Sequence, residues 1–384
     1  MHSILNKNPI VVILFAPILF ALVISLLFLP AAFAKPKEIP IVLISLDEGA
    51  QGPAGRVNMG EMIIQNIVNA PQQQNSGRNI VAWTVLDGRQ SVEQGFNEKL
   101  YYGALIIPQN FSQAFLSSFS STPVVPVIEI MINQGLNVQV AEAVSVILHG
   151  VAQKSGEGIQ ANIKEVIISS NMVNQTMLES LINPIKINET HYNAVGEGTA
   201  NGMGHAFLFL PTWVASVGAA ALIFFSLIRK NERNWQSLGK QLALGLLAGL
   251  LIGFSVATIG AWMLQISFNF IAVAFFLSLA ATVCIWLIIA VVAWLGVAGL
   301  GMAALFVVLG FGLIMLPMEL VPTIYKDWVY SWLPLRFILD GLREIFYFSS
   351  GWWTGASTVL CFIGLGSLVV FLASKFRPAS FPVR

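Results

Sequence analysis

Residues 270–291 read FIAVAFFLSLAATVCIWLIIAV, a stretch in which no side chain carries a charge. It exceeds the roughly 20 apolar residues that a helix needs to cross a hydrocarbon core. Because lipid offers no partners for backbone N–H and C=O groups, such a segment crosses as a helix. Five further segments share this character: residues 9–34, 206–228, 241–265, 295–316 and 355–374. The sequence therefore predicts a polytopic α-helical membrane protein with six transmembrane helices in contact with the lipid bilayer.

The composition fits this class. Charged residues make up 10% of the chain, against about 25% in soluble domains. The chain has a net charge of +1 and no block of basic residues outside short loops, which argues against a nucleic-acid partner. Both cysteines, Cys284 and Cys361, fall in predicted spans. A disulfide framework is therefore excluded for the soluble block between the first and second spans.

The positions of lysine and arginine indicate the orientation. The loop at 229–240 holds four basic residues against one acid, and the C-terminal tail holds Lys375, Arg377 and Arg384 without an acid. Short loops rich in lysine and arginine stay in the cytoplasm. We therefore predict a multi-pass membrane protein, with the N- and C-termini cytoplasmic and residues 35–205 outside.

Three domains are expected: an N-terminal transmembrane anchor at 1–34, an extracytoplasmic α/β domain at 35–205, and a five-helix transmembrane domain at 206–384. The first span has an alternative interpretation. Lys7 precedes the apolar run and Ala32-Phe33-Ala34 ends it, so a cleaved signal peptide is the other possibility. The apolar run is longer than the usual signal core, which favours the retained anchor. Either form leaves the soluble block outside.

The soluble block alternates short apolar runs with helical periodicity. Helices are expected at 57–69 and 91–98, after Ser112, and from Asn137 to about Leu181 with an interruption near Gly156 and Gly158. Alternation of this kind predicts a small α/β domain with a largely parallel sheet, inserted between the first and second transmembrane helices. The expected strands are residues 39–46, 79–86, 101–107 and 125–132.

No catalytic constellation stands out in this block. His149, His191 and His205 are scattered along the chain, and we expect them at the surface or at helix ends rather than around a metal. Asp47 and Glu48 follow the first strand, where a turn is a better interpretation than a cation site. The sequence thus predicts no enzyme activity, no cofactor and no metal site.

Two groups of motifs resemble a known family. Tyr101-Tyr102-Gly103-Ala104-Leu105-Ile106-Ile107-Pro108-Gln109-Asn110-Phe111-Ser112 and the following Ile132-Asn133-Gln134-Gly135-Leu136-Asn137 resemble the signatures of ABC type-2 transporter permeases and their YhgE/Pip (phage infection protein) relatives. Leu316-Pro317-Met318-Glu319-Leu320-Val321-Pro322, Leu333-Pro334-Leu335-Arg336 and Asp340-Gly341-Leu342-Arg343 are similar to the membrane half of the same superfamily. The order of one span, an external domain and five spans also agrees.

The resemblance implies an exporter-like subunit that works as a homodimer with a separate ATP-binding subunit. The chain itself lacks the G-x-x-x-x-G-K-[ST] phosphate loop, since its only Gly-Lys pair, Gly239-Lys240, is followed by Gln241. A docking loop for the ATPase is expected between the second and third spans, and a plain basic hairpin is the alternative. The candidate docking residues are Arg229, Lys230, Arg233, Trp235 and Lys240.

Three glycines repeat every four residues in the third span, at Gly245, Gly249 and Gly253. Small residues at this spacing let two helix backbones approach closely in lipid. We expect them to pack within the helix bundle, and a dimer interface is the alternative.

Residues 317–354 are broken by prolines and rich in aromatic side chains, which prefer the headgroup zone of a membrane. A helix over 335–348 is expected to lie as an external interfacial or re-entrant segment, in which Arg336 and Asp340 pair at i, i+4. An aromatic surface loop is the alternative. The resemblance implies an external gate here, with Glu319, Arg336, Asp340 and Arg343 as its candidate residues.

None of the six span cores carries Asp, Glu, His, Lys or Arg. Proton- and ion-coupled transporters need titratable groups inside their spans, so this class is disfavoured. With the resemblance, we predict a permease of a bacterial plasma membrane that exports an amphipathic or lipid-like molecule, a peptide or a drug. The alternative is a non-transporting surface receptor or secretion-system scaffold.

Overall fold

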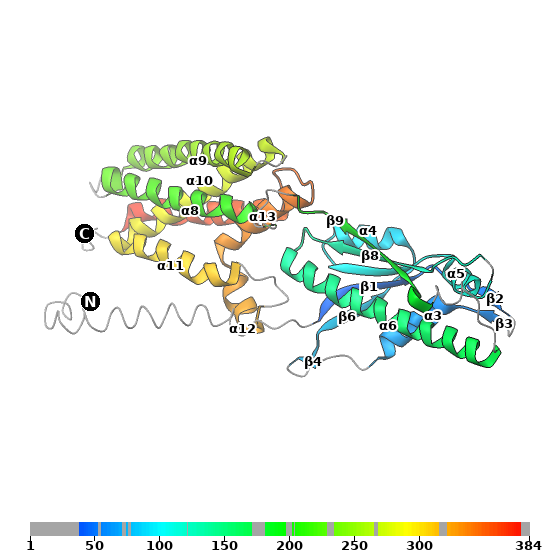
Figure 1. The fold of residues 1–384 in the computed structure, drawn as a ribbon. Helices are drawn as coiled ribbons and strands as arrows, with labels where there is room; N and C mark the ends of the chain where they lie inside the picture. The colour runs from blue at the N-terminus through cyan, green and yellow to red at the C-terminus, as the bar shows by residue number, and fades with distance from the viewer. Residues whose placement is uncertain are drawn as a thin grey trace, which may run out of the picture. The chain divides into compact units, whose positions relative to one another are not determined.

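The computed structural model describes residues 38–52, 55–70, 74–75, 78–120, 122–170, 181–196, 202, 204–228, 234–264, 268–314 and 321–377. The chain divides into two compact units, drawn in Figure 1. Pro36–Val195 forms one, here called the sheet unit, and Met1–Lys35 with Gly196–Arg384 forms the other, here called the helical unit. The predicted first span at 9–34 lies outside the described residues.

The sheet unit contains a five-stranded sheet in the order β6-β1-β7-β8-β9. Only the β7–β8 pair is antiparallel, so the expectation of a largely parallel sheet is confirmed. Two small hairpins, β2–β3 and β4–β5, were not anticipated. The strands are β1 (Ile39–Ser45), β2 (Ala50–Gly52), β3 (Gly55–Val57), β4 (Gln74–Asn75), β5 (Arg78–Asn79), β6 (Val81–Val85), β7 (Gly103–Ile107), β8 (Val127–Asn133) and β9 (Lys186–Tyr192).

Strand β9 was missed because its sequence, KINETHY, is polar and largely exposed at the edge of the sheet. Apolar alternation, the usual signal for a strand with one buried face, is weak in such an edge strand. Its parallel pairing with β8 brings a segment near residue 190 beside a segment near residue 130. That long-range pairing leaves no local trace in the sequence.

Helices cover both faces of the sheet. Val92 and Phe96 of α4 (Arg89–Asn97) pack on Val42 and Ile44. The opposite face carries α6 (Val138–Ser170), which packs on β7 and β8, and α3 (Met59–Asn69), which packs on β1; Figure 1 shows α6 running along the sheet. A short helix, α5 (Phe111–Ser117), follows β7.

Helix α6 is continuous from residue 138 to residue 170, so the expected interruption near Gly156 and Gly158 is wrong. A glycine inside a helix costs roughly 1 kcal/mol relative to alanine. Tertiary contacts outweigh that cost, because Val144 and Leu148 pack over Gly103 and Ile185 packs against Gly156.

The helical unit is built around α10 (Phe270–Leu295). Of the apolar core of α10, 72% is buried within the unit, against 28% for α9, so α10 is the central helix. Four helices of the described part are long and apolar enough to cross a membrane, over Gly204–Leu227, Trp235–Met263, Phe270–Leu295 and Gly355–Phe376. They coincide with the predicted spans at 206–228, 241–265, 270–291 and 355–374.

The remaining elements of this unit are shorter or connect the long helices. Helix α8 (Gly204–Ile223) continues as a π-helix, η1 (Phe224–Ile228). Of the predicted span at 295–316, the structure describes α11 (Val297–Ile314), with side chains only to Phe306. The others are α9 (Trp235–Leu264), α12 (Thr323–Tyr325), η2 (Lys326–Tyr330), α13 (Pro334–Tyr347), α14 (Gly355–Ala373) and η3 (Ser374–Phe376).

Asp47 joins three elements of the sheet unit at the carboxyl end of β1. Its buried carboxylate accepts hydrogen bonds from Gly60 N at 2.9 Å and Ser112 N at 2.9 Å, the second residues of α3 and α5. It also accepts from the Ser112 hydroxyl, whose oxygen accepts from Met59 N at 2.8 Å. Helix N-termini present unpaired N–H groups and a positive dipole end, which a carboxylate satisfies. Asp47 is therefore a structural cap for two helices.

Replacing Asp47 with alanine should lower the unfolding free energy of the sheet unit by about 2–4 kcal/mol, because two helix caps of roughly 1–2 kcal/mol each are lost. Asp47→Asn retains acceptor oxygen and should lose less. Glu48→Ala, at the exposed neighbouring residue, is the matched control and should change stability by less than about 0.5 kcal/mol. Thermal unfolding of the full chain measures the three variants; equal effects of Asp47→Ala and Glu48→Ala would contradict the cap.

Candidate functional site

Helices α9 and α10 approach each other closely at two glycines of α9. A Cβ atom placed on Gly249 would lie 2.7 Å from Thr282 N, and one placed on Gly253 would lie 2.5 Å from the Ser278 Cα atom. One turn further along, Gly245 faces Trp286, with its Cβ position 3.1 Å from the indole Nε1. We call this contact the glycine seam.

The partners on α10 repeat with the same spacing of four residues, which is what two helices packed along one stripe require. Their polar atoms are satisfied without water: Thr282 Oγ1 donates to Ser278 O at 2.8 Å, and Ser278 Oγ donates to Ala274 O at 2.7 Å. Trp286 Nε1 donates across the seam to Leu242 O at 3.3 Å. The sequence pointed to the glycines, whereas these three partners were missed.

Helix α13 packs into the unit beside α10. Its apolar side chains Leu335, Ile338 and Leu342 are buried, and a Cβ atom on Gly341 would collide with the ring of Phe276. The alternative of an aromatic surface loop is therefore wrong for residues 334–347: the proline at the first helical position and the apolar stripe favour a helix.

The polar side of α13 holds the expected ion pair. Arg336 Nε donates to Asp340 Oδ2 at 3.0 Å, and the guanidinium lies over the Tyr330 ring at 4.5 Å. Arg336 and Asp340 expose 23% and 29% of their side chains, so the pair is half-buried and ties α13 to η2. Glu319 lies outside the described residues, and Arg343 is half-buried further along α13.

His205 and Tyr347 pack where α8 begins and α13 ends. Their rings meet edge to face with centroids 5.7 Å apart, and the Tyr347 hydroxyl donates to Gly202 O at 3.0 Å. Burial, opposed in part by Arg343, raises the pKa of Tyr347 to about 12, so the hydroxyl remains a donor. His205 lies at a helix start, as expected, but it is buried rather than at the surface.

Basic and aromatic side chains meet at one end of the helical unit. The Lys375 ammonium lies 3.8 Å from the centroid of the Trp235 ring, which joins the start of α9 to the residues after α14. Arg377 Nη1 donates to Ala293 O at 2.7 Å near the end of α10. Lys240 is exposed on the second turn of α9. We call this region the basic end; Arg229, Lys230 and Arg233 lie outside the described residues.

The sequence suggested that His149 and His191 are scattered, but the structure of the sheet unit brings them together. Both contact Glu189: His149 Nδ1 at 3.3 Å and His191 Nε2 at 2.8 Å from its carboxylate oxygens. Their convergence depends on β9, which the sequence did not reveal. Among the described residues, no group of three His, Cys, Asp or Glu is placed to hold a metal ion.

Comparison with known proteins adds one finding. A sequence model described as an ABC-2 family transporter protein matches residues 10–375, which is nearly the whole chain. The match takes in both the sheet unit and the helical unit. No curated protein and no solved structure gives a significant match.

Gly253→Leu should destabilise the helical unit by at least about 1–3 kcal/mol, because the added side chain has to push α9 and α10 apart. Gly239→Leu, on the same helix, is the matched control, since a Cβ atom there meets nothing within 4 Å. The two variants are compared as full-length proteins heated in detergent. The measured quantity is the midpoint temperature at which half of the protein is no longer monodisperse. A midpoint for Gly253→Leu equal to that of Gly239→Leu would show that the glycine seam is not a close contact.

Proposed function

We propose that this chain, which belongs to the ABC-2 family of transporter proteins, is the membrane permease subunit of an exporter. The family establishes a membrane transporter. The proposal adds the direction of transport, an amphipathic or lipid-like molecule, a peptide or a drug as the cargo, a separate ATPase and a homodimer. The residues of the helical unit support these additions in different ways.

The distribution of charge in the long helices carries the proposal. From Gln241 to Leu264 in α9, throughout α10, and from Gly355 to Ala373 in α14, no side chain is charged. A pathway among such helices offers no Asp, Glu, His, Lys or Arg as a proton relay and no charged ligand for ions. It is compatible with cargo that is itself largely apolar, and the energy then has to come from a partner.

The basic end is the proposed docking surface for that ATPase. It gathers the start of α9 and the ends of α10 and α14, and its Trp235 side chain is 55% exposed. Tryptophan and arginine are enriched at protein interfaces, and the basic end contains Trp235 and Arg377. Basic residues also favour the cytoplasmic side, where ATP is available. This placement makes the C-terminus cytoplasmic, and six spans would then make the N-terminus cytoplasmic as well.

The opposite side of the membrane is then assigned to α13 and to the sheet unit. We propose that α13 forms an external interfacial or re-entrant gate, with the Arg336–Asp340 pair fixing its polar side. The sheet unit would be an extracytoplasmic domain inserted after the first span. Membership of the YhgE/Pip-like branch and the alternative of a surface receptor or scaffold remain predictions from motifs.

The ATPase partner is testable through Trp235. Full-length tagged protein purified from its native membrane should bring ATP hydrolysis with it, and Trp235→Ala should reduce that activity roughly thirtyfold, since truncating a central interface tryptophan typically costs about 2 kcal/mol of binding. Trp328→Ala is the matched control, because Trp328 is also exposed but lies on η2, away from the basic end.

ATP hydrolysis that co-purifies with Trp328→Ala but not with Trp235→Ala would support the docking surface. If the wild-type protein co-purifies with no more ATP hydrolysis than a mock purification, the ATP-driven exporter is overturned and the surface receptor is favoured. Equal losses in the two variants would overturn the basic end as the docking site.

A further inference from the structure

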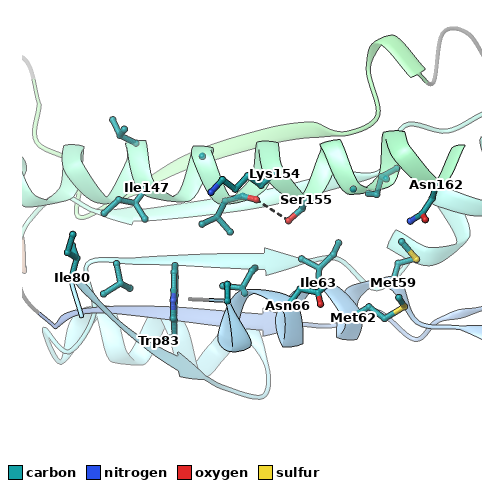
Figure 2. Close-up of a pocket in the computed structure, with 18 residues that line it drawn as sticks. Met59, Met62, Ile63, Asn66, Ile80, Trp83, Ile147, Lys154, Ser155 and Asn162 are labelled. Atoms are coloured by element: carbon teal, nitrogen blue, oxygen red, sulfur yellow. Dashed lines mark hydrogen bonds between the residues drawn. The ribbon is translucent and has the colours of Figure 1, made fainter. Parts of the chain in front are cut away.

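A cavity of about 520 Å³ opens in the sheet unit between α3, α6 and β6. Figure 2 shows Met59 and Met62 of α3 across from Asn162 of α6 at one end of this space, and Ile80 and Trp83 across from Ile147 at the other end. Sites for small molecules typically measure about 300–1,000 Å³ and are mostly apolar. We call this cavity the α3–α6 groove.

The sheet forms the floor of the groove. Trp83 of β6 pairs with Ile41 of β1, which pairs with Gly103 of β7, and Gly103 lies under α6. Alternation along the strands therefore turns Trp83 toward the same face that α6 covers. Trp83 and Ile80 line the groove from below, as Figure 2 shows.

Two glycines keep the groove open on the α6 side. Gly150 and Gly158 both line it, and a Cβ atom at either would meet nothing within 4 Å. Neither glycine is explained by close packing, unlike Gly156 on the same helix. Each costs the helix roughly 0.5–1 kcal/mol relative to alanine. The cost is offset if the empty space is used by a ligand.

The chemistry of the lining is that of an amphiphile site. Methionines at 59 and 62 adapt their shape to apolar chains of different outline. Among the described residues that line the groove, Lys154 alone is charged. The neutral polar groups are the amides of Asn66 and Asn162 and the Ser155 hydroxyl, which donates to Val151 O at 3.0 Å. A single exposed cation beside an apolar floor is complementary to one negative charge at the end of one apolar chain.

We infer that the α3–α6 groove binds a single-chain amphiphile with a singly charged acidic head group, of the long-chain carboxylate class. The apolar chain lies over Trp83 and against the methionines of the α3 wall, and the carboxylate pairs with Lys154. Binding follows from the groove alone, whereas a part in receiving cargo rests on the proposed export function.

Photo-crosslinking on the full chain tests this inference. The protein is reconstituted in nanodiscs, because detergent would compete for the groove, and exposed to a long-chain carboxylate that carries a diazirine near the end of its chain. Adducts are mapped by mass spectrometry. We expect them on peptides from α3, β6 and α6, in addition to adducts on the exposed apolar face of α9, which serve as the reference for probe dissolved in the bilayer.

Three variants separate binding in the groove from labelling elsewhere. Gly158→Leu fills open space and should reduce the groove adducts about tenfold relative to the α9 adducts. Gln153→Leu adds the same side chain at an exposed site of α6 that does not line the groove, and should leave them unchanged. Lys154→Gln should reduce capture of the carboxylate about threefold but not capture of the corresponding alcohol.

Adducts absent from α3, β6 and α6, or reduced equally by Gly158→Leu and Gln153→Leu, would overturn the inference. Equal capture of carboxylate and alcohol by the wild type would overturn the role of Lys154. The groove inference and the export proposal fail separately. Loss of the groove adducts would not change the amount of ATPase that co-purifies with the chain. Thermal midpoints of all three variants at or above that of the wild type confirm that each is folded.

Discussion

Hydrocarbon accepts neither an isolated charge nor an unpaired backbone hydrogen bond, and the helical unit is arranged around this constraint. Its long helices are uncharged along their cores, and the polar atoms of Ser278 and Thr282 bond to the backbone of their own helix. Without water to drive apolar groups together, close packing has to hold such helices. The glycine seam supplies that packing and fixes α9 on the central helix α10, against which α8, α13 and α14 also pack.

The sheet unit is organised by buried hydrogen bonds at the ends of its strands. Residues of the motifs around Phe111-Ser112 and Asn133 act as structural groups here. Ser112 shares Asp47 with the starts of α3 and α5, and the fully buried Asn133 donates to Phe96 O at 3.1 Å and accepts from Asn193 Nδ2 at 3.0 Å. Asn137 caps α6 through Val140 N at 3.0 Å. A sequence signature of a transporter family can therefore reflect the stability of a domain rather than contact with cargo.

Apolar periodicity was enough to predict four of the long helices, the main parallel strands and α13, because each buries a face whose pattern is visible locally. The sequence could not reveal β9, which is polar and pairs with a distant strand, nor the meeting of His149 and His191 at Glu189 that follows from it. It pointed to Gly249 and Gly253 but not to their partners. It also treated Gly156 and Gly158 alike, whereas one packs against Ile185 and the other opens onto the α3–α6 groove.

We propose that lipid surrounds the helical unit, with the basic end in the cytoplasm and the sheet unit outside. Two matched single-cysteine variants test it most directly in a chain with Cys284 and Cys361 replaced by alanine. Gln113→Cys is exposed on the sheet unit, and Gln236→Cys is exposed at the start of α9. On intact cells, a membrane-impermeant maleimide should label Gln113→Cys and should label Gln236→Cys only after permeabilisation. Labelling of Gln236→Cys on intact cells, with Gln113→Cys protected, would contradict the account.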